Sequence, residues 1–261
     1  MPYIKLENCD IYYEIHGQDD PLLLIHGLGS SSQDWEMQLP EFSNHFQVIS
    51  IDLRGHGQSS KAPGPYSIPL FAEDTVKLIR ALKLSSVHLL GISLGGMVAF
   101  QLVLDYPEVI RSLIIVNSVP ELIAHNLNDR ISYWKRILIT KLFGMERMGQ
   151  VLAEQFFLEP EQEGIREVFI QHWAENHKGS YLASLKAAVG WSVMGHLGEI
   201  QAPTLVIGAE DDYFSNAEKE RYTRLMPNAE LVVVEDSRHA LPAEKPAEFN
   251  QIVLSFLHSF A

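Results

Sequence analysis

The sequence predicts a protein of the α/β class, built on a mostly parallel sheet of eight strands with helices on both faces and an inserted helical segment. Short apolar runs alternate with helical segments along most of the chain, which is the pattern of parallel strands joined by crossover helices. The chain has 261 residues, 46% of them hydrophobic, so a large core can form. Only the stretch 120–195 breaks the alternation, because it contains no clear strand.

Eight short runs rich in apolar residues predict the strands of the sheet. They lie at residues 4–6, 11–15, 22–25, 48–51, 86–90, 112–116, 204–208 and 231–234. The first two flank Asn8-Cys9-Asp10 and predict an antiparallel hairpin. Leu22-Leu23-Leu24-Ile25 is a continuous apolar run, which is typical of a strand buried on both faces.

Helices are expected between these strands. The segment 73–84 has helical spacing, with Val76, Ile79 and Leu82 near one face. A second helix is expected at 96–104, and a third closes the chain at 246–260.

The stretch 120–195 predicts a helical cap, inserted between core segments 1–119 and 196–261. Its expected helices are interrupted at Gly144, Pro160, Gly164 and Gly179. It also holds three of the four tryptophans. If the cap covers a site, its aromatic side chains would form a largely apolar pocket, for which the candidates are Trp134, Phe157 and Trp191, with Gly27 from the core.

Composition excludes several classes of partner. The net charge of −13 argues against nucleic acid and anionic membranes, since both require basic patches. Cys9 is the only cysteine, so no intrachain disulfide can form. No basic and apolar leader is visible after Met1, and no apolar run approaches the ~20 residues of a membrane span. We expect a cytoplasmic protein, monomeric or homodimeric.

The stretch Gly91-Ile92-Ser93-Leu94-Gly95 carries the strongest chemical signal. It lies between an expected strand and an expected helix, and strand, G-x-S-x-G, helix is the context of a nucleophile elbow. The glycines allow a turn too sharp for larger residues, and the turn exposes the serine hydroxyl. Ser93 is therefore the candidate nucleophile.

A serine hydroxyl needs a base to activate it and an acid to orient that base. In the expected chain order the acid follows a late strand, where Glu210-Asp211-Asp212 lies. Asp211 is the preferred acid, Asp212 is the fallback and Glu210 is weaker. His239, on the loop after the last strand, is the expected base.

The tetrahedral intermediate of acyl transfer needs two N–H donors directed at its oxyanion. One is expected from Leu94, which follows the nucleophile, and the other from Leu28 in the loop His26-Gly27-Leu28-Gly29. His26 is expected to be structural. The sequence shows no metal-binding pattern, and we expect no cofactor.

These motifs together resemble the α/β-hydrolase fold family, in its esterase and lactonase group. The resemblance covers roughly residues 10–119 and 196–260, and it includes Asp52-Leu53-Arg54-Gly55-His56-Gly57-Gln58-Ser59, which is similar to a largely architectural D-x-R-G-x-G-x-S loop of the family. Pro63-Gly64-Pro65-Tyr66-Ser67 also resembles the 3-oxoadipate enol-lactonases. The resemblance implies a serine hydrolase that cleaves a carboxylic ester or lactone through an acyl-serine intermediate. The aromatic residues of the cap favour a small, apolar and uncharged substrate.

Other activities stay open at this point. The fold also serves small-molecule receptors that keep the triad and turn over slowly, so fold alone does not separate the two. A thioesterase, or an esterase acting on a carrier-protein-bound acyl chain, is a further alternative. Cofactor-free haloperoxidases share the same three residue types, so a perhydrolase side activity is also open.

Overall fold

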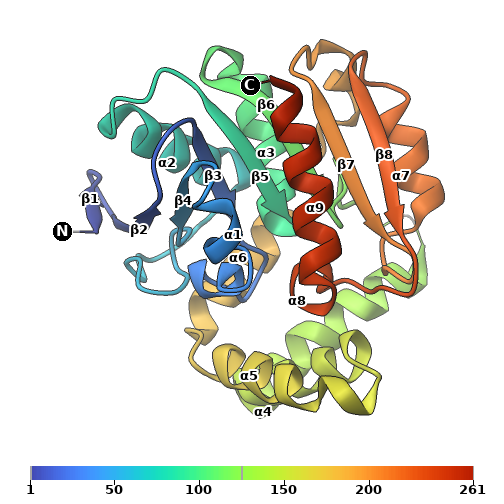
Figure 1. The fold of residues 1–261 in the computed structure, drawn as a ribbon. Coiled ribbons are helices and arrows are strands. Elements are labelled where there is room, and N and C mark those ends of the chain that lie inside the picture. The colour runs from blue at the N-terminus through green and yellow to red at the C-terminus, as the bar shows by residue number, and fades with distance from the viewer. Residues whose placement is uncertain (1, 125, 261) are drawn as a thin grey trace.

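A single eight-stranded sheet organises the molecule, and a computed structural model describes it for residues 2–124 and 126–260 (Figure 1). Residues 1, 125 and 261 lie outside the described residues. Residues 1 and 261 are the outer ends of the predicted core, and residue 125 belongs to the predicted cap. The strands are β1 (Tyr3–Lys5), β2 (Asp10–His16), β3 (Pro21–Ile25), β4 (Gln47–Ile51), β5 (Val87–Ile92), β6 (Ile110–Val116), β7 (Thr204–Ala209) and β8 (Ala229–Val234).

The strand order is β1-β2-β4-β3-β5-β6-β7-β8. β2 pairs antiparallel with both β1 and β4, and every other neighbouring pair is parallel. The predicted fold class is therefore confirmed. Because β3, β5, β7 and β8 run parallel, the loops that follow them meet at one edge of the sheet, where ligands bind in open α/β folds.

Helices lie on both faces of the sheet. They are α1 (Leu39–Phe42), α2 (Ile68–Ala81), α3 (Leu94–Asp105), α4 (Leu127–Phe156), α5 (Glu163–Ala174), α6 (Lys178–Ala188), α7 (Asn216–Thr223), α8 (Leu241–Glu244) and α9 (Pro246–Leu257). Short 3-10 helices are η1 (Ser32–Trp35), η2 (Pro107–Val109), η3 (Pro160–Gln162), η4 (Met194–Glu199) and η5 (His258–Phe260). α2 begins earlier than predicted because the Ser67 hydroxyl caps it by accepting the Leu70 N–H.

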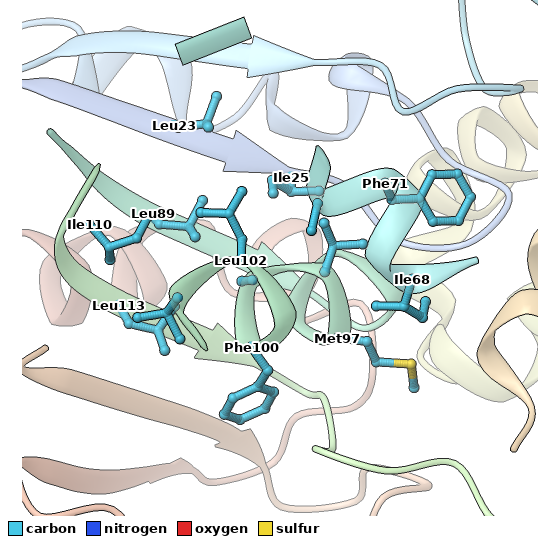
Figure 2. Packing of buried hydrophobic residues seen from close by; sticks show 14 of the residues in the cluster. Leu23, Ile25, Ile68, Phe71, Leu89, Met97, Phe100, Leu102, Ile110 and Leu113 are labelled. Carbon is cyan, nitrogen blue, oxygen red and sulfur yellow. The ribbon is translucent and has the colours of Figure 1, made fainter. Parts of the chain in front are cut away.

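Two apolar layers hold these helices against the sheet. Along β3, Leu23 and Ile25 face the layer that contains α2 and α3, whereas Leu22 and Leu24 face the layer that contains α1 and α9. Figure 2 shows part of the first layer, in which Phe100 and other α3 side chains pack beside the sheet residues. Burial on both faces explains why these strands are continuous apolar runs.

The chain between β6 and β7 forms α4, α5 and α6, and Figure 1 shows α4 and α5 grouped beyond one end of the sheet. Gly144 interrupts α4 with a φ of +84°, and Pro160 opens η3, as the sequence predicts. Gly164 and Gly179 are the second residues of α5 and α6, so a new helix does begin at each place, one residue before the glycine. The N–H groups of a first turn have no intrahelical acceptor, which makes glycine tolerable at those positions. The cap boundaries at 120 and 195 stay a prediction.

No helix in the described part of the chain has the length and apolar character needed to cross a bilayer.

Candidate active site

Ser93 lies in a strained turn between β5 and α3. Its φ is +54°, a left-handed conformation that a non-glycine residue adopts only when its surroundings force it. A Cβ on Gly91 would lie 2.3 Å from the Gly95 carbonyl oxygen, and a Cβ on Gly95 would lie 2.2 Å from the Ile25 carbonyl oxygen. Both glycines are therefore required by close backbone contact, and the turn has the geometry of a nucleophile elbow.

His239 is held by a carboxylate from the loop after β7. Its Nδ1 lies 2.6 Å from Asp212 Oδ1, and the Asp212 side chain has no exposed surface. Burial alone would raise the pKa of Asp212, but His239 and Lys219 outweigh it and hold that pKa below its usual value. Asp212 is therefore a buried carboxylate that fixes the orientation of the imidazole.

The acid that contacts His239 is Asp212, and the prediction of Asp211 is wrong. The Asp211 side chain is 63% exposed, and its carboxylate lies 3.9 Å from the Arg238 guanidinium. Glu210 accepts the backbone N–H of Asp236, so it does not contact His239 either. The reason is that β7 continues through Ala209, one residue beyond its predicted end, and a shift of one residue exchanges inward and outward side chains.

Lys219 anchors the loop that carries Asp212. Its ammonium lies 2.7 Å from Asp212 Oδ2, and it also donates to the Phe214 carbonyl and to Asn216. Neither side chain of the Lys219–Asp212 pair is exposed to solvent. Burial lowers the pKa of Lys219 in spite of the adjacent carboxylate.

Lys219→Met should destabilise the protein by about 3–5 kcal/mol, because it leaves Asp212 buried with half of its neutralising partners. Urea unfolding measures this change. Arg221→Met removes an exposed cation from the same helix, α7, and should change the free energy of unfolding by less than about 0.5 kcal/mol. Equal effects of the two substitutions would contradict a structural role for Lys219.

Tyr213 separates the expected base from the expected nucleophile. Its hydroxyl lies 2.7 Å from His239 Nε2 and 3.4 Å from Ser93 Oγ. The rings of Tyr213 and His239 stack, with their centroids 4.0 Å apart. Burial of the hydroxyl raises the pKa of Tyr213 to about 12, so the phenol is neutral at ordinary pH. The sequence reasoning missed this residue, although an aromatic residue directly after the Asp211-Asp212 pair was an available signal.

The loop after β3 lies against the nucleophile. A Cβ on Gly27 would lie 3.5 Å from the Ser93 Cβ, so the absence of a side chain keeps that approach open. Leu94 is the first residue of α3, and its N–H therefore has no intrahelical acceptor. Leu28 and Leu94 both line the cavity above Ser93. The assignment of their N–H groups to an oxyanion hole stays a prediction.

His26 supports this loop. Its Nε2 accepts the Leu53 N–H at 3.0 Å, and its Nδ1 lies 2.7 Å from the Gly27 carbonyl oxygen. Burial lowers the pKa of His26 to about 4, so the ring is neutral. Asp52, from the loop after β4, accepts the backbone N–H groups of Ser32 and Gln58. These contacts are structural, as the sequence indicates.

A cavity of about 930 Å³ lies over Ser93, His239 and Tyr213. Gly27 and Trp134 line it as predicted, whereas Phe157 and Trp191 do not. Phe157 is buried in the apolar cluster of α4 and α5, and the Trp191 indole donates to Gln101 at 2.8 Å. The predicted pocket set is therefore wrong at those two positions. Apolar side chains of α4 form much of the wall, and Arg136 adds a cation to it.

Comparison with known proteins agrees with this fold. The family described as alpha/beta hydrolase fold matches residues 20–136. A protein of Azorhizobium caulinodans named "Putative carbamate hydrolase RutD" is 30% identical, with 98% of each chain covered. A protein of Acinetobacter baylyi named (E)-2-((N-methylformamido)methylene)succinate hydrolase is 27% identical, with 97% of this chain and 95% of that protein covered.

Solved structures are similar over the same extent. A hydrolase from Pseudomonas aeruginosa has a TM-score of 0.89 and 28% identity, with 98% of this chain and 97% of that chain covered. Est816, an N-acyl homoserine lactone degrading enzyme, has a TM-score of 0.83 and 28% identity, with 98% of this chain and 100% of that chain covered. The chain belongs to the alpha/beta hydrolase fold family. It is a hydrolase, and proteins similar to it include one named as a carbamate hydrolase and one named as a lactone-degrading enzyme.

Proposed function

We propose that the enzyme hydrolyses a carboxylic ester or lactone of a small molecule through an acyl intermediate on Ser93. The observation that carries this proposal is the hydrogen bond between His239 Nδ1 and the buried Asp212, at 2.6 Å. Because Nδ1–H donates to the carboxylate, Nε2 keeps its lone pair and faces the Ser93 side of the cavity. That tautomer is the one a general base requires.

Acylation follows from these positions. Nε2 of His239 takes the Ser93 proton as Oγ forms a bond to the substrate carbonyl carbon. The N–H groups of Leu28 and Leu94 donate to the oxyanion that develops on the carbonyl oxygen. As the carbon–oxygen bond to the leaving group breaks, Nε2–H transfers its proton to the departing alkoxide. Ser93 then carries the acyl group as an ester.

Deacylation repeats the steps with water. His239 Nε2 takes a proton from water while the water oxygen bonds to the acyl carbon, and the same N–H groups hold the oxyanion. The bond to Ser93 Oγ breaks, and the proton on Nε2 returns to Oγ. A lactone differs only in that its leaving hydroxyl stays attached to the acyl group.

Tyr213 has to leave its position before these steps. Its hydroxyl lies where a leaving-group oxygen or the hydrolytic water would bond to His239 Nε2. In this mechanism an incoming substrate displaces the Tyr213 phenol, and a hydrogen bond from Ser93 Oγ–H to His239 Nε2 then forms.

Tyr213→Phe should therefore raise the reactivity of Ser93, because the ring stays while its competing hydroxyl is removed. The rate constant for inactivation by a small phosphonofluoridate should rise by about 3–10-fold, the value of one hydrogen bond. Tyr106→Phe, at a tyrosine after the end of α3, is the matched control and should leave that rate unchanged. A fall of about 100-fold or more would show that the hydroxyl takes part in catalysis.

Carbamates are a second candidate substrate class, because the relative from Azorhizobium caulinodans bears a carbamate hydrolase name. The same attack on a carbamate carbonyl would give a carbamoyl-serine instead of an acyl-serine.

A substrate panel tests the proposed function. It contains p-nitrophenyl esters of increasing chain length, several lactones and a p-nitrophenyl carbamate, each with wild-type enzyme and with Ser93→Ala. We expect Ser93-dependent turnover of esters or lactones. Only a few slow turnovers with every substrate would support the receptor alternative instead. Faster turnover of matched thioesters than of oxygen esters would support a thioesterase.

A further inference from the structure

Arg136 is a charged residue of the cavity that has no role in the proposed mechanism. It projects from α4 into the cavity that contains Ser93. Its Nε donates to the Tyr181 hydroxyl at 2.6 Å, and it also interacts with the Tyr213 hydroxyl. Burial opposes its charge, but the two hydroxyls outweigh that effect and raise the pKa of Arg136, so the guanidinium stays charged.

The buried arginine and lysine among residues 2–124 and 126–260, Arg54 and Lys219, have carboxylate partners. Arg54 forms two hydrogen bonds with Asp74, at 2.7 and 2.8 Å, and Lys219 pairs with Asp212. Arg136 differs, because no ion pair found among residues 2–124 and 126–260 joins it to a carboxylate. Arg136 is partly buried, and a planar guanidinium in such a position is best satisfied by two parallel hydrogen bonds to an anion, because hydroxyls supply no negative charge. The net charge of −13 means that acidic residues outnumber basic ones, so the lack of an ion-pair partner for Arg136 does not reflect a shortage of carboxylates.

The other charged groups of the lining do not share this environment. Arg130 and Lys135 are exposed on α4. Asp34 accepts a hydrogen bond from Ser30, and Glu121 accepts one from Ser192. Asp129 and Glu218 lie in the first turns of α4 and α7, where acidic side chains favour the helix.

Arg136 and Ser93 line the same cavity, and the Tyr213 hydroxyl, which lies 3.4 Å from Ser93 Oγ, also interacts with Arg136. A small substrate whose scissile carbonyl lies at Ser93 can therefore present a second functional group to the guanidinium. A carboxylate two or three carbons from that carbonyl is the simplest such group.

We propose that Arg136 is a specificity-determining residue that binds a carboxylate on the acyl part of the substrate. This inference rests on the proposed function, and it narrows the substrate class to small anionic esters or lactones. It replaces the expectation, drawn from the aromatic composition of the cap, of an uncharged apolar substrate. The apolar wall of α4 would then contact the carbon chain between the two functional groups.

The test compares two esters that differ only in charge. Monomethyl succinate carries a carboxylate, and methyl isocaproate has an isopropyl group in its place. Methanol release gives kcat/KM for each. The wild-type enzyme should prefer monomethyl succinate, and Arg136→Gln should lower kcat/KM for it by at least about 30-fold, the value of a buried charged pair, while changing that for methyl isocaproate by less than about threefold.

Two further variants separate binding from folding. Arg136→Lys keeps the charge without the planar fork, and it should recover part of the preference. Lys141→Gln removes a cation from an exposed position of the same helix, outside the cavity lining, and it should leave the preference unchanged. Thermal unfolding shows whether each variant is folded, and a folded Arg136→Gln enzyme with the wild-type preference would overturn the inference.

A binding measurement keeps this inference distinguishable from the proposed function. Calorimetry with succinate on Ser93→Ala should show binding, and Ser93→Ala combined with Arg136→Gln or Arg136→Lys should show weaker binding or none. If succinate binding depends on Arg136 but the wild-type enzyme hydrolyses no ester, the anion site is supported and the proposed ester hydrolysis is contradicted. If ester turnover requires Ser93 but does not depend on the charge of the substrate, the proposed hydrolysis is supported and the anion site is contradicted.

Discussion

Ser93→Ala should lower kcat for ester or lactone hydrolysis by about 10³–10⁶-fold. The alanine removes the oxygen that forms the acyl bond, while the turn between β5 and α3 depends on Gly91 and Gly95 and stays intact. Steady-state kinetics on the substrate panel measure the loss.

The size of the remaining rate is itself informative. Cavity binding and the N–H groups of Leu28 and Leu94 would still act on substrate in the variant. Circular dichroism and thermal unfolding should be unchanged, since Ser93 Oγ makes a single hydrogen bond within residues 2–124 and 126–260, to the Tyr213 hydroxyl at 3.4 Å. Turnover near the wild-type rate in a carefully purified variant would refute the serine mechanism.

Asp212→Asn should lower kcat by about 10⁴-fold. The amide cannot accept the His239 Nδ1–H as the carboxylate does, so the imidazole loses both the tautomer and the charge stabilisation it needs. Asp211→Asn is the matched control, one residue away on the exposed side of the loop, and it should change kcat by less than about tenfold. Parallel kinetics of the two variants provide the comparison.

A larger loss from Asp211→Asn than from Asp212→Asn would contradict the assignment. The Lys219 contact requires a stability control, because Asp212→Asn also weakens a buried ion pair. Chemical unfolding of the Asp212→Asn enzyme should show that it remains folded under assay conditions.

Much of the fold could be predicted from local patterns. Leu22-Leu23-Leu24-Ile25 has to be a strand buried on both faces, and its side chains do alternate between the two apolar layers. Gly91 and Gly95 predicted the sharp turn because contacts below 2.5 Å leave no room for a Cβ at either position. Ser93 and His239 followed from the order of motifs along the chain.

The predictions that were wrong depend on the exact residue at which a strand ends, or on packing between side chains that are distant in the sequence. The choice between Asp211 and Asp212 depended on whether β7 ended at Gly208 or Ala209, and strand ends are the least determined feature of a sequence pattern. Trp191 was predicted to line the pocket from its residue type, whereas its indole is directed to Gln101. The position of Tyr213 between Ser93 and His239 is a property of side-chain direction, which no spacing rule encodes.

The acyl-serine intermediate is the central claim, and it can be trapped directly. Turnover of p-nitrophenyl butyrate is stopped with acid during the first seconds, and mass spectrometry then examines the peptide that contains Ser93. We predict a butyryl group on Ser93, in an amount that matches a burst of p-nitrophenol and that is absent from Ser93→Ala. Hydrolysis at the full wild-type rate with neither a burst nor an adduct on Ser93 would contradict the mechanism.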